Sequence, residues 1–216
     1  MTRAQLLTRV QHLCDHSQRS LLTPEKAYAQ GAGGYGEALR LMWGGQYAEA
    51  ALQASAILAE EAETEVRFQL YRLWIEALAE QHDLPSLRLL GNLLLTVGRA
   101  NPDDQATYVA LRGLVHFELD ELQAARLLAK ACADDLTNAY GLELVQRVSQ
   151  RDGRPNHLLL SEVPLVDYFH WQTAARSLLA DGFRDELNLV LSCVREQCHV
   201  APLSHMFEFH LCIEAG

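Results

Sequence analysis

The sequence predicts an all-α protein made of antiparallel helical hairpins. Apolar residues recur at steps of three and four along nearly the whole chain, and runs of β-branched residues are nearly absent. The segments between these helical patterns are short, which indicates that successive helices run antiparallel. Of the 216 residues, 49% are hydrophobic and 21% are charged, a balance that suits a folded protein with a sizeable core.

Two helices are expected before the first tight turn. In the first, residues 3–19, Leu6, Leu7 and Val10 form part of an apolar stripe. The second begins at Thr23-Pro24, because threonine caps a helix well and proline fits its first position. It is expected to end near Gly44, where Gly45-Gln46-Tyr47 forms a turn.

The next helices are separated by short turns and are expected at residues 47–62, 64–81 and 85–99. Asn101-Pro102-Asp103 then stops one helix and caps another, since acidic residues in a first turn favour the helix dipole. Helices over residues 105–118, 120–133 and 137–151 follow. The segment from Arg151 to Asn156 holds glycine and proline and is the clearest linker.

Two last helices, at residues 165–180 and 184–197, precede a tail after Pro202. The predicted organisation is therefore an N-terminal helix at 1–22, hairpins and one following helix at 23–151, a linker at 152–164, and a C-terminal hairpin with a capping tail at 165–216.

Charge and hydropathy exclude several classes of partner. The chain has 28 acidic and 18 basic residues and a net charge of −10, which opposes binding to nucleic acid and to anionic membranes. No apolar stretch approaches the roughly 20 residues that cross a bilayer. The N-terminal residues lack the apolar core of a secretory signal, and the five scattered cysteines suit free thiols, so a cytoplasmic location is expected.

A turn pattern repeats along the chain. Gly45-Gln46-Tyr47, His82-Asp83-Leu84 and Asp120-Glu121-Leu122 each place an apolar residue at a helix corner, with Ala50, Leu87 or Ala125 three residues later. The corners are 37 and 38 residues apart, close to the period of about 34 residues in tetratricopeptide repeats. The chain resembles that family.

The resemblance is best in the third unit, at Gly113, Asp120, Leu122, Ala125 and Ala129, and the first unit also matches. A weaker fourth unit includes Trp171, Ala175, Leu178, Gly182 and Leu187. The chain departs from the family at Arg112, His116 and Arg184, and at Leu87 and Gly91 in the second unit.

The resemblance implies three tetratricopeptide-like hairpins within residues 23–151, stacked as a right-handed superhelix, or α-α solenoid, with a concave inner surface. By the family's geometry, the partner-binding groove would include Tyr35, Leu39, Arg72, Glu76, Leu114 and Phe117. Such a groove, apolar with a charged centre, suits a peptide segment of another protein.

The expected function is therefore a non-catalytic interaction scaffold or chaperone, with no cofactor. Arginine-rich, lysine-poor usage is typical of GC-rich bacteria. By analogy, small acidic proteins that resemble this family in such organisms include secretion chaperones, notably of type III systems. No catalytic residue is expected, because no serine, histidine or aspartate lies in a context that would activate it.

Other features leave alternatives open. The glycines of residues 31–36 follow no strand and lack a phosphate-binding lysine, so a helix junction is favoured. A second function class is a metal- or thiol-dependent enzyme or sensor, although the usual paired ligand spacings are missing and no metal site is expected. Its candidate ligands are Cys193, Cys198, His199, His205, His210 and Cys212.

A third class is an oligomerisation or regulatory module. The helix at residues 3–19 could pair with its copy in a homodimer. The apolar tail at residues 206–213 could cap the last hairpin or contact another chain.

Overall fold

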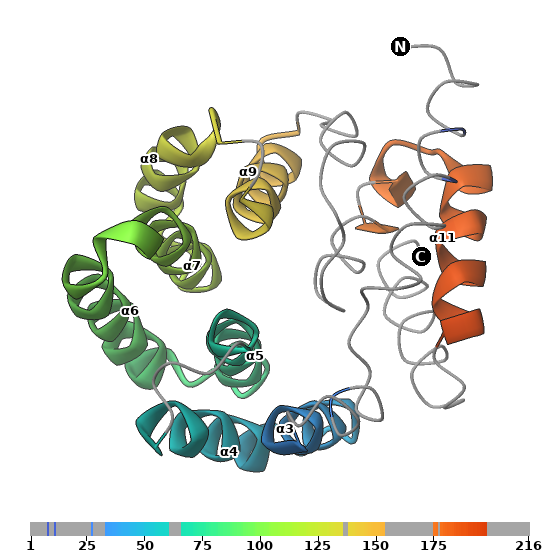
Figure 1. The fold of residues 1–216 in the computed structure, drawn as a ribbon. Helices are drawn as coiled ribbons and strands as arrows, with labels where there is room; N and C mark the ends of the chain where they lie inside the picture. The colour runs from blue at the N-terminus through green and yellow to red at the C-terminus, as the bar shows by residue number, and fades with distance from the viewer. Residues whose placement is uncertain are drawn as a thin grey trace. The chain divides into compact units, whose positions relative to one another are not determined.

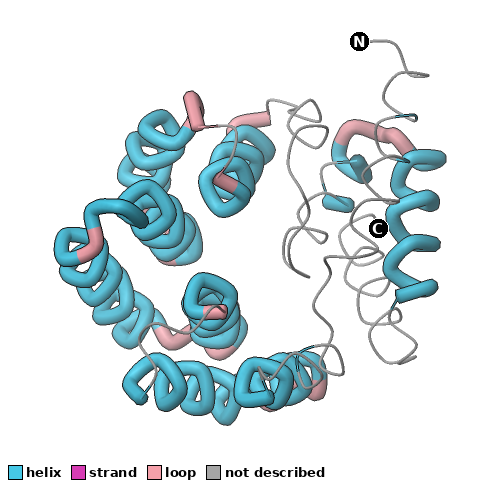
Figure 2. The backbone as a smooth tube through the Cα atoms, in the orientation of Figure 1, coloured by secondary structure: helices cyan, strands magenta, loops and turns pink. Residues whose placement is uncertain are grey.

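The computed structural model describes Thr8, Gln11, Ala27 and residues 33–60, 66–135, 138–153, 175–176 and 178–197. These residues form helices joined by short turns, with no strand among them (Figure 2). The all-α prediction is therefore confirmed for this part of the chain. The tail after residue 197, residues 154–174, and the helix at 3–19 apart from helical Thr8 and Gln11 lie outside the described residues.

The chain divides into two compact units, residues 22–134 and residues 1–21 with 135–216. The described helices of the second unit are α9 (Ala139–Arg151) and α11 (Arg184–Gln197), with helical residues also at 175–176 and 178–180. The sequence grouped α9 with the hairpins, whereas the structure groups it with the C-terminal residues. The first unit contains α3 (Gly33–Trp43), α4 (Tyr47–Glu60), α5 (Arg67–Glu80), α6 (Leu84–Ala100), the short 3-10 helix η1 (Pro102–Asp104), α7 (Gln105–Glu118) and α8 (Leu122–Cys132).

Residues 33–134 form three successive hairpins, α3–α4, α5–α6 and α7–α8. The first helices are also neighbours, because α5 contacts both α3 and α7. The helices α4, α6 and α8 form a row, and we call them the outer helices. The helices α5 and α7 lie on the inner side of this row (Figure 1). We call α3, α5 and α7 the inner helices.

Four turns between described helices share one backbone geometry. In each, a residue with positive φ follows the helix: Gly45 (73°), His82 (55°), Asp120 (57°) and Gly182 (75°). The next amide donates to a carbonyl five residues back, which is the Schellman arrangement. These bonds are Gln46 N to Leu41 O (2.9 Å), Asp83 N to Leu78 O (3.0 Å), Glu121 N to His116 O (2.9 Å) and Phe183 N to Leu178 O (2.9 Å). The predicted corners are thus real and repeated.

Two glycines let α6 and α7 approach closely. A Cβ atom at Gly98 would lie 2.8 Å from Cβ of Tyr108, and one at Gly91 would lie 3.2 Å from Cγ1 of Val115. The glycines are seven residues apart, as are their partners, so both contacts lie along one face of each helix. Gly91, a departure from the repeat pattern, therefore has a packing role.

Candidate partner-binding site

The inner helices carry all six residues that the sequence assigns to a partner groove. Each helix contributes two side chains that lie about one turn apart and so share a face. Tyr35 and Leu39 are on α3, Arg72 and Glu76 are on α5, and Leu114 and Phe117 are on α7. Since α5 contacts α3 and α7, the structure places the three pairs on neighbouring helices.

Five of these six side chains are buried. Only Phe117, near the end of α7, is half-buried. Arg72 is 1% exposed, although arginine is among the residues that are rarely fully buried unless paired. The five side chains therefore do not lie on the accessible surface, and a partner reaches them only if the surrounding side chains move apart. Their role in binding stays a prediction.

Arg72 and Glu76 form a buried ion pair one turn apart on α5. The Nη1 atom of Arg72 donates to Oε2 of Glu76 at 2.9 Å. Removing one member of such a pair costs about 3–5 kcal/mol, because the remaining charge is left buried. Replacing both members with apolar residues is often neutral. The pair thus places two charges among the inner helices, and it stabilises the fold little more than two apolar residues would.

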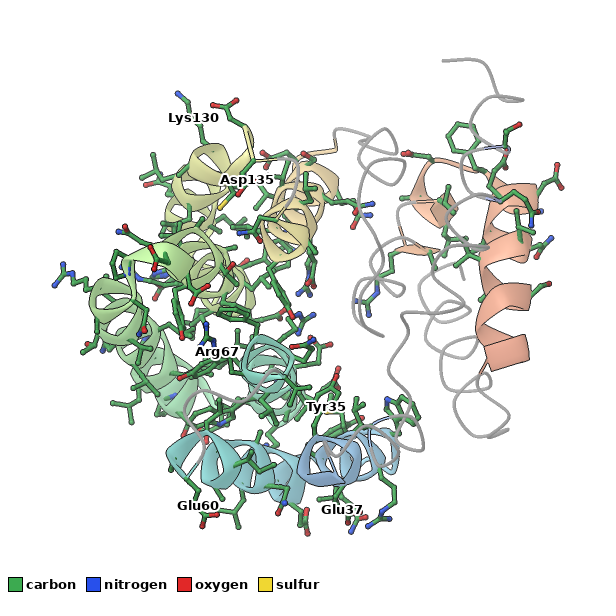
Figure 3. The ribbon with its side chains drawn as sticks, viewed as in Figure 1. Tyr35, Glu37, Glu60, Arg67, Lys130 and Asp135 are labelled. Atoms are coloured by element: carbon green, nitrogen blue, oxygen red, sulfur yellow. The ribbon has the colours of Figure 1, made fainter. Side chains whose placement is uncertain are left out.

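An aromatic cluster joins the N-terminal ends of α5 and α7. The guanidinium of Arg67, which is labelled in Figure 3, lies 4.7 Å from the ring centroid of Phe68 and forms an ion pair with Asp104. Edge-to-face contacts link the Tyr108 ring to Phe68 (5.4 Å between centroids) and to Tyr71 (5.9 Å).

Burial is the main cause that raises the pKa of both tyrosine hydroxyls in this cluster. The cluster was not predicted from the sequence. Its signal was the interval of 37 residues between Tyr71 and Tyr108, the same interval that separates two corners.

Polar contacts link corners to neighbouring hairpins. Burial, and then the carboxylates of Glu80 and Glu76 on α5, raise the pKa of the corner residue Tyr47. At the third corner, His116 Nδ1 lies 2.7 Å from Oε2 of Glu121, and Arg88 of α6 lies 3.5 Å from Oε1 of the same carboxylate.

The hydrogen bond with His116 is the largest cause that holds the pKa of Glu121 below its usual value. Arg88 of α6 thus connects the second hairpin to the corner of the third through an exposed ion pair, a kind of contact that contributes little to stability.

The described residues contain no group of three or more His, Cys, Asp or Glu side chains that could hold a metal ion. In the proposed Cys/His group, Cys193 lies in α11, and the other five members lie outside the described residues. Residues 33–36 form the first turn of α3, so these glycines are helical. Within the described part of the chain, no helix combines the length and apolarity needed to span a membrane.

Comparison of the chain with protein-family models, curated proteins and solved structures found no match.

Proposed function

We propose that the chain is a non-catalytic protein-interaction scaffold built from tetratricopeptide-like hairpins. The observation that carries this proposal is the repeated corner. One backbone geometry recurs at intervals of 37 and 38 residues, and the inner helices contact one another in succession. Repetition of this kind is typical of solenoid proteins, which use extended surfaces to bind other proteins.

In this proposal, the inner helices hold a peptide segment of a partner. Tyr35, Leu39, Leu114 and Phe117 supply apolar contacts, and the Arg72–Glu76 pair supplies charge at the centre. Because five of these side chains are buried, binding requires the inner surface to open. Half-buried Phe117 is the member that a partner would reach first.

The first experiment replaces the buried pair without leaving a lone charge. An Arg72→Met/Glu76→Leu variant should keep its helical content and its melting temperature, because apolar residues of similar volume replace a buried pair at little cost. It should lose a partner that co-purifies with the wild type from the source organism. Retention of every partner by a folded variant would show that the pair does not take part in binding.

The second experiment uses Phe117, which is half-buried and therefore safer to truncate. A Phe117→Ala variant should weaken the same partner's binding by about tenfold while the protein stays folded, because a partly exposed aromatic anchor contributes about 1–2 kcal/mol at an interface. Binding is measured by titration with the purified partner. Unchanged affinity in both variants rejects the inner helices as the site.

A chaperone, including one that serves a bacterial secretion system, is the narrower form of this function. It requires that the partner aggregate when produced alone and stay soluble with the wild-type chain. The acidic net charge supports this form, since it would keep a complex with an apolar client in solution.

A further inference from the structure

The outer helices present an exposed leucine at one repeated position. Leu52 in α4, Leu89 in α6 and Leu127 in α8 each lie five residues after the corner residue of their hairpin. They are 71%, 69% and 72% exposed. A single exposed leucine needs no explanation. Three at equivalent positions on successive hairpins indicate a surface with a periodic pattern.

The charges around these leucines differ between the helices. The exposed charged residues of α4 are Glu49 and Glu60, so the surroundings of Leu52 are acidic. On α6 and α8 the exposed charged side chains are all basic: Arg88, Arg99, Arg126 and Lys130. Leu93, one turn after Leu89, extends the apolar surface of α6. We call Leu89, Leu93, Leu127, Arg99 and Lys130 the basic leucine surface.

We propose that the basic leucine surface binds an acidic amphipathic helix of a partner protein. Leucines four residues apart on α6 match the spacing of apolar residues along one face of a helix. Arg99 and Lys130 would pair with carboxylates that flank this face; Lys130 points away from the inner helices (Figure 3). Arg88 already lies near Glu121, so it is not needed for the interaction.

Charge favours a peptide segment over a membrane. A bilayer with anionic lipids is an extended surface and would meet the field of a protein whose net charge is −10, including the acidic surroundings of Leu52. A single helix would contact only the local basic surface, because salt screens charges beyond about 8 Å. This proposal uses the outer helices and does not depend on the function proposed for the inner ones.

The test uses two labelled peptides of about 15 residues, long enough to form a helix when bound. Both carry leucines along one helical face, and their remaining positions are glutamate in one and lysine in the other. The wild-type protein should bind the glutamate peptide, as measured by fluorescence anisotropy, and binding should weaken as salt increases. Equal or tighter binding of the lysine peptide, or no binding of the glutamate peptide, overturns the proposal.

Variants then locate the contact. Leu89→Glu/Leu127→Glu should weaken binding of the glutamate peptide by at least about tenfold. Leu52→Glu is the matched control. Leu52 is also a leucine at the same repeat position and is exposed to the same extent as Leu89 and Leu127, but its charged neighbours are acidic. The Leu52→Glu variant should therefore bind the glutamate peptide with unchanged affinity. All three leucines are mostly exposed, so these variants should keep the wild-type circular dichroism. Equal loss in the control and the double variant would mean that charge alone is responsible and would overturn the assigned surface.

Charge reversal provides an independent readout. An Arg99→Glu/Lys130→Glu variant should prefer the lysine peptide, whereas a variant that merely lost structure would bind neither. The Arg72→Met/Glu76→Leu variant should bind the glutamate peptide like the wild type, which separates this proposal from the function of the inner helices. Vesicles of phosphatidylcholine with phosphatidylserine are the last probe. The proposal is overturned if the protein binds these vesicles through Leu89 and Leu127 but does not bind the glutamate peptide. That result would identify a membrane, not an acidic helix, as the ligand of this surface.

Discussion

His82 and Asp120 occupy the same left-handed backbone position that glycine occupies at two other corners. Their φ angles are 55° and 57°, against 73° at Gly45 and 75° at Gly182. A side chain with a Cβ atom costs about 1–2 kcal/mol in this conformation, whereas glycine adopts it freely. The corner geometry is therefore retained at two positions that lack glycine, and the residues there, histidine and aspartate, adopt this conformation more often than most other residues with a Cβ atom.

Replacing His82 with glycine should stabilise the protein. The exposed imidazole has no close packing to lose, and the relief of backbone strain exceeds the extra entropy of glycine in the unfolded chain. We expect the free energy of unfolding to rise by about 0.5 kcal/mol, measured by urea titration with circular dichroism.

Gly45→Ala is the matched control for His82→Gly. A Cβ at Gly45 would meet no atom within 4 Å, so its only effect is backbone strain, and it should lower the free energy of unfolding by about 1 kcal/mol. A loss of stability in His82→Gly would mean that the His82 side chain contributes more than its exposure suggests.

At the scale of the helices, local signals in the sequence place several helix ends at the observed residue and most other described ends within about two residues of it. The predicted helices at 105–118 and 184–197 match α7 and α11 at both ends. The corner at residues 44–46 was predictable because glycine and a following apolar residue mark a turn and a new helix. Burial of Arg72 was not predictable, because it depends on how neighbouring helices enclose α5. The leucines of the outer helices were also missed, since helical spacing alone does not separate a core leucine from an exposed one.

Helix packing gives a second prediction, at the contact between α6 and α7. In a Gly98→Ala variant the new methyl group would overlap Cβ of Tyr108, which is fixed to the α7 backbone and cannot turn away. The two helices must separate, so we expect a loss of about 1–2 kcal/mol even though alanine favours a helix. Thermal unfolding followed by circular dichroism measures this loss.

Gly34→Ala controls for the change of residue type. A Cβ at Gly34 would lie 2.9 Å from Cδ1 of Ile57, the far end of a flexible side chain that can rotate. This variant should therefore be neutral or slightly more stable. If Gly98→Ala behaves like Gly34→Ala, then α6 and α7 are not as closely packed as the structure indicates.

At the scale of the whole molecule, the chain combines a repeated part with a part that the corner pattern covers only weakly. Residues 22–134 contain the three hairpins, and each hairpin packs against the next, α4 against α5 and α6 against α7. In such an arrangement stability comes from hairpins and from the contacts between them, so loss of a hairpin exposes the surface of the next. The sequence predicted this repeat from its corners. It did not predict that the division into units falls after α8, because no glycine or proline marks residues 133–135.

The division into two units predicts that residues 22–134 fold when produced alone. A compact unit with its own core should remain helical, stay monomeric and unfold cooperatively, as tested by circular dichroism and light scattering. The informative comparison is a shorter fragment, residues 22–100, which lacks α7 and α8. That fragment should aggregate or unfold, because it exposes the face of α6 on which Gly91, Leu94 and Gly98 are buried in the full chain. If residues 22–134 are unfolded alone while the full chain is folded, then the hairpins depend on the rest of the chain for their stability. That result would rule out a scaffold in which residues 22–134 act independently.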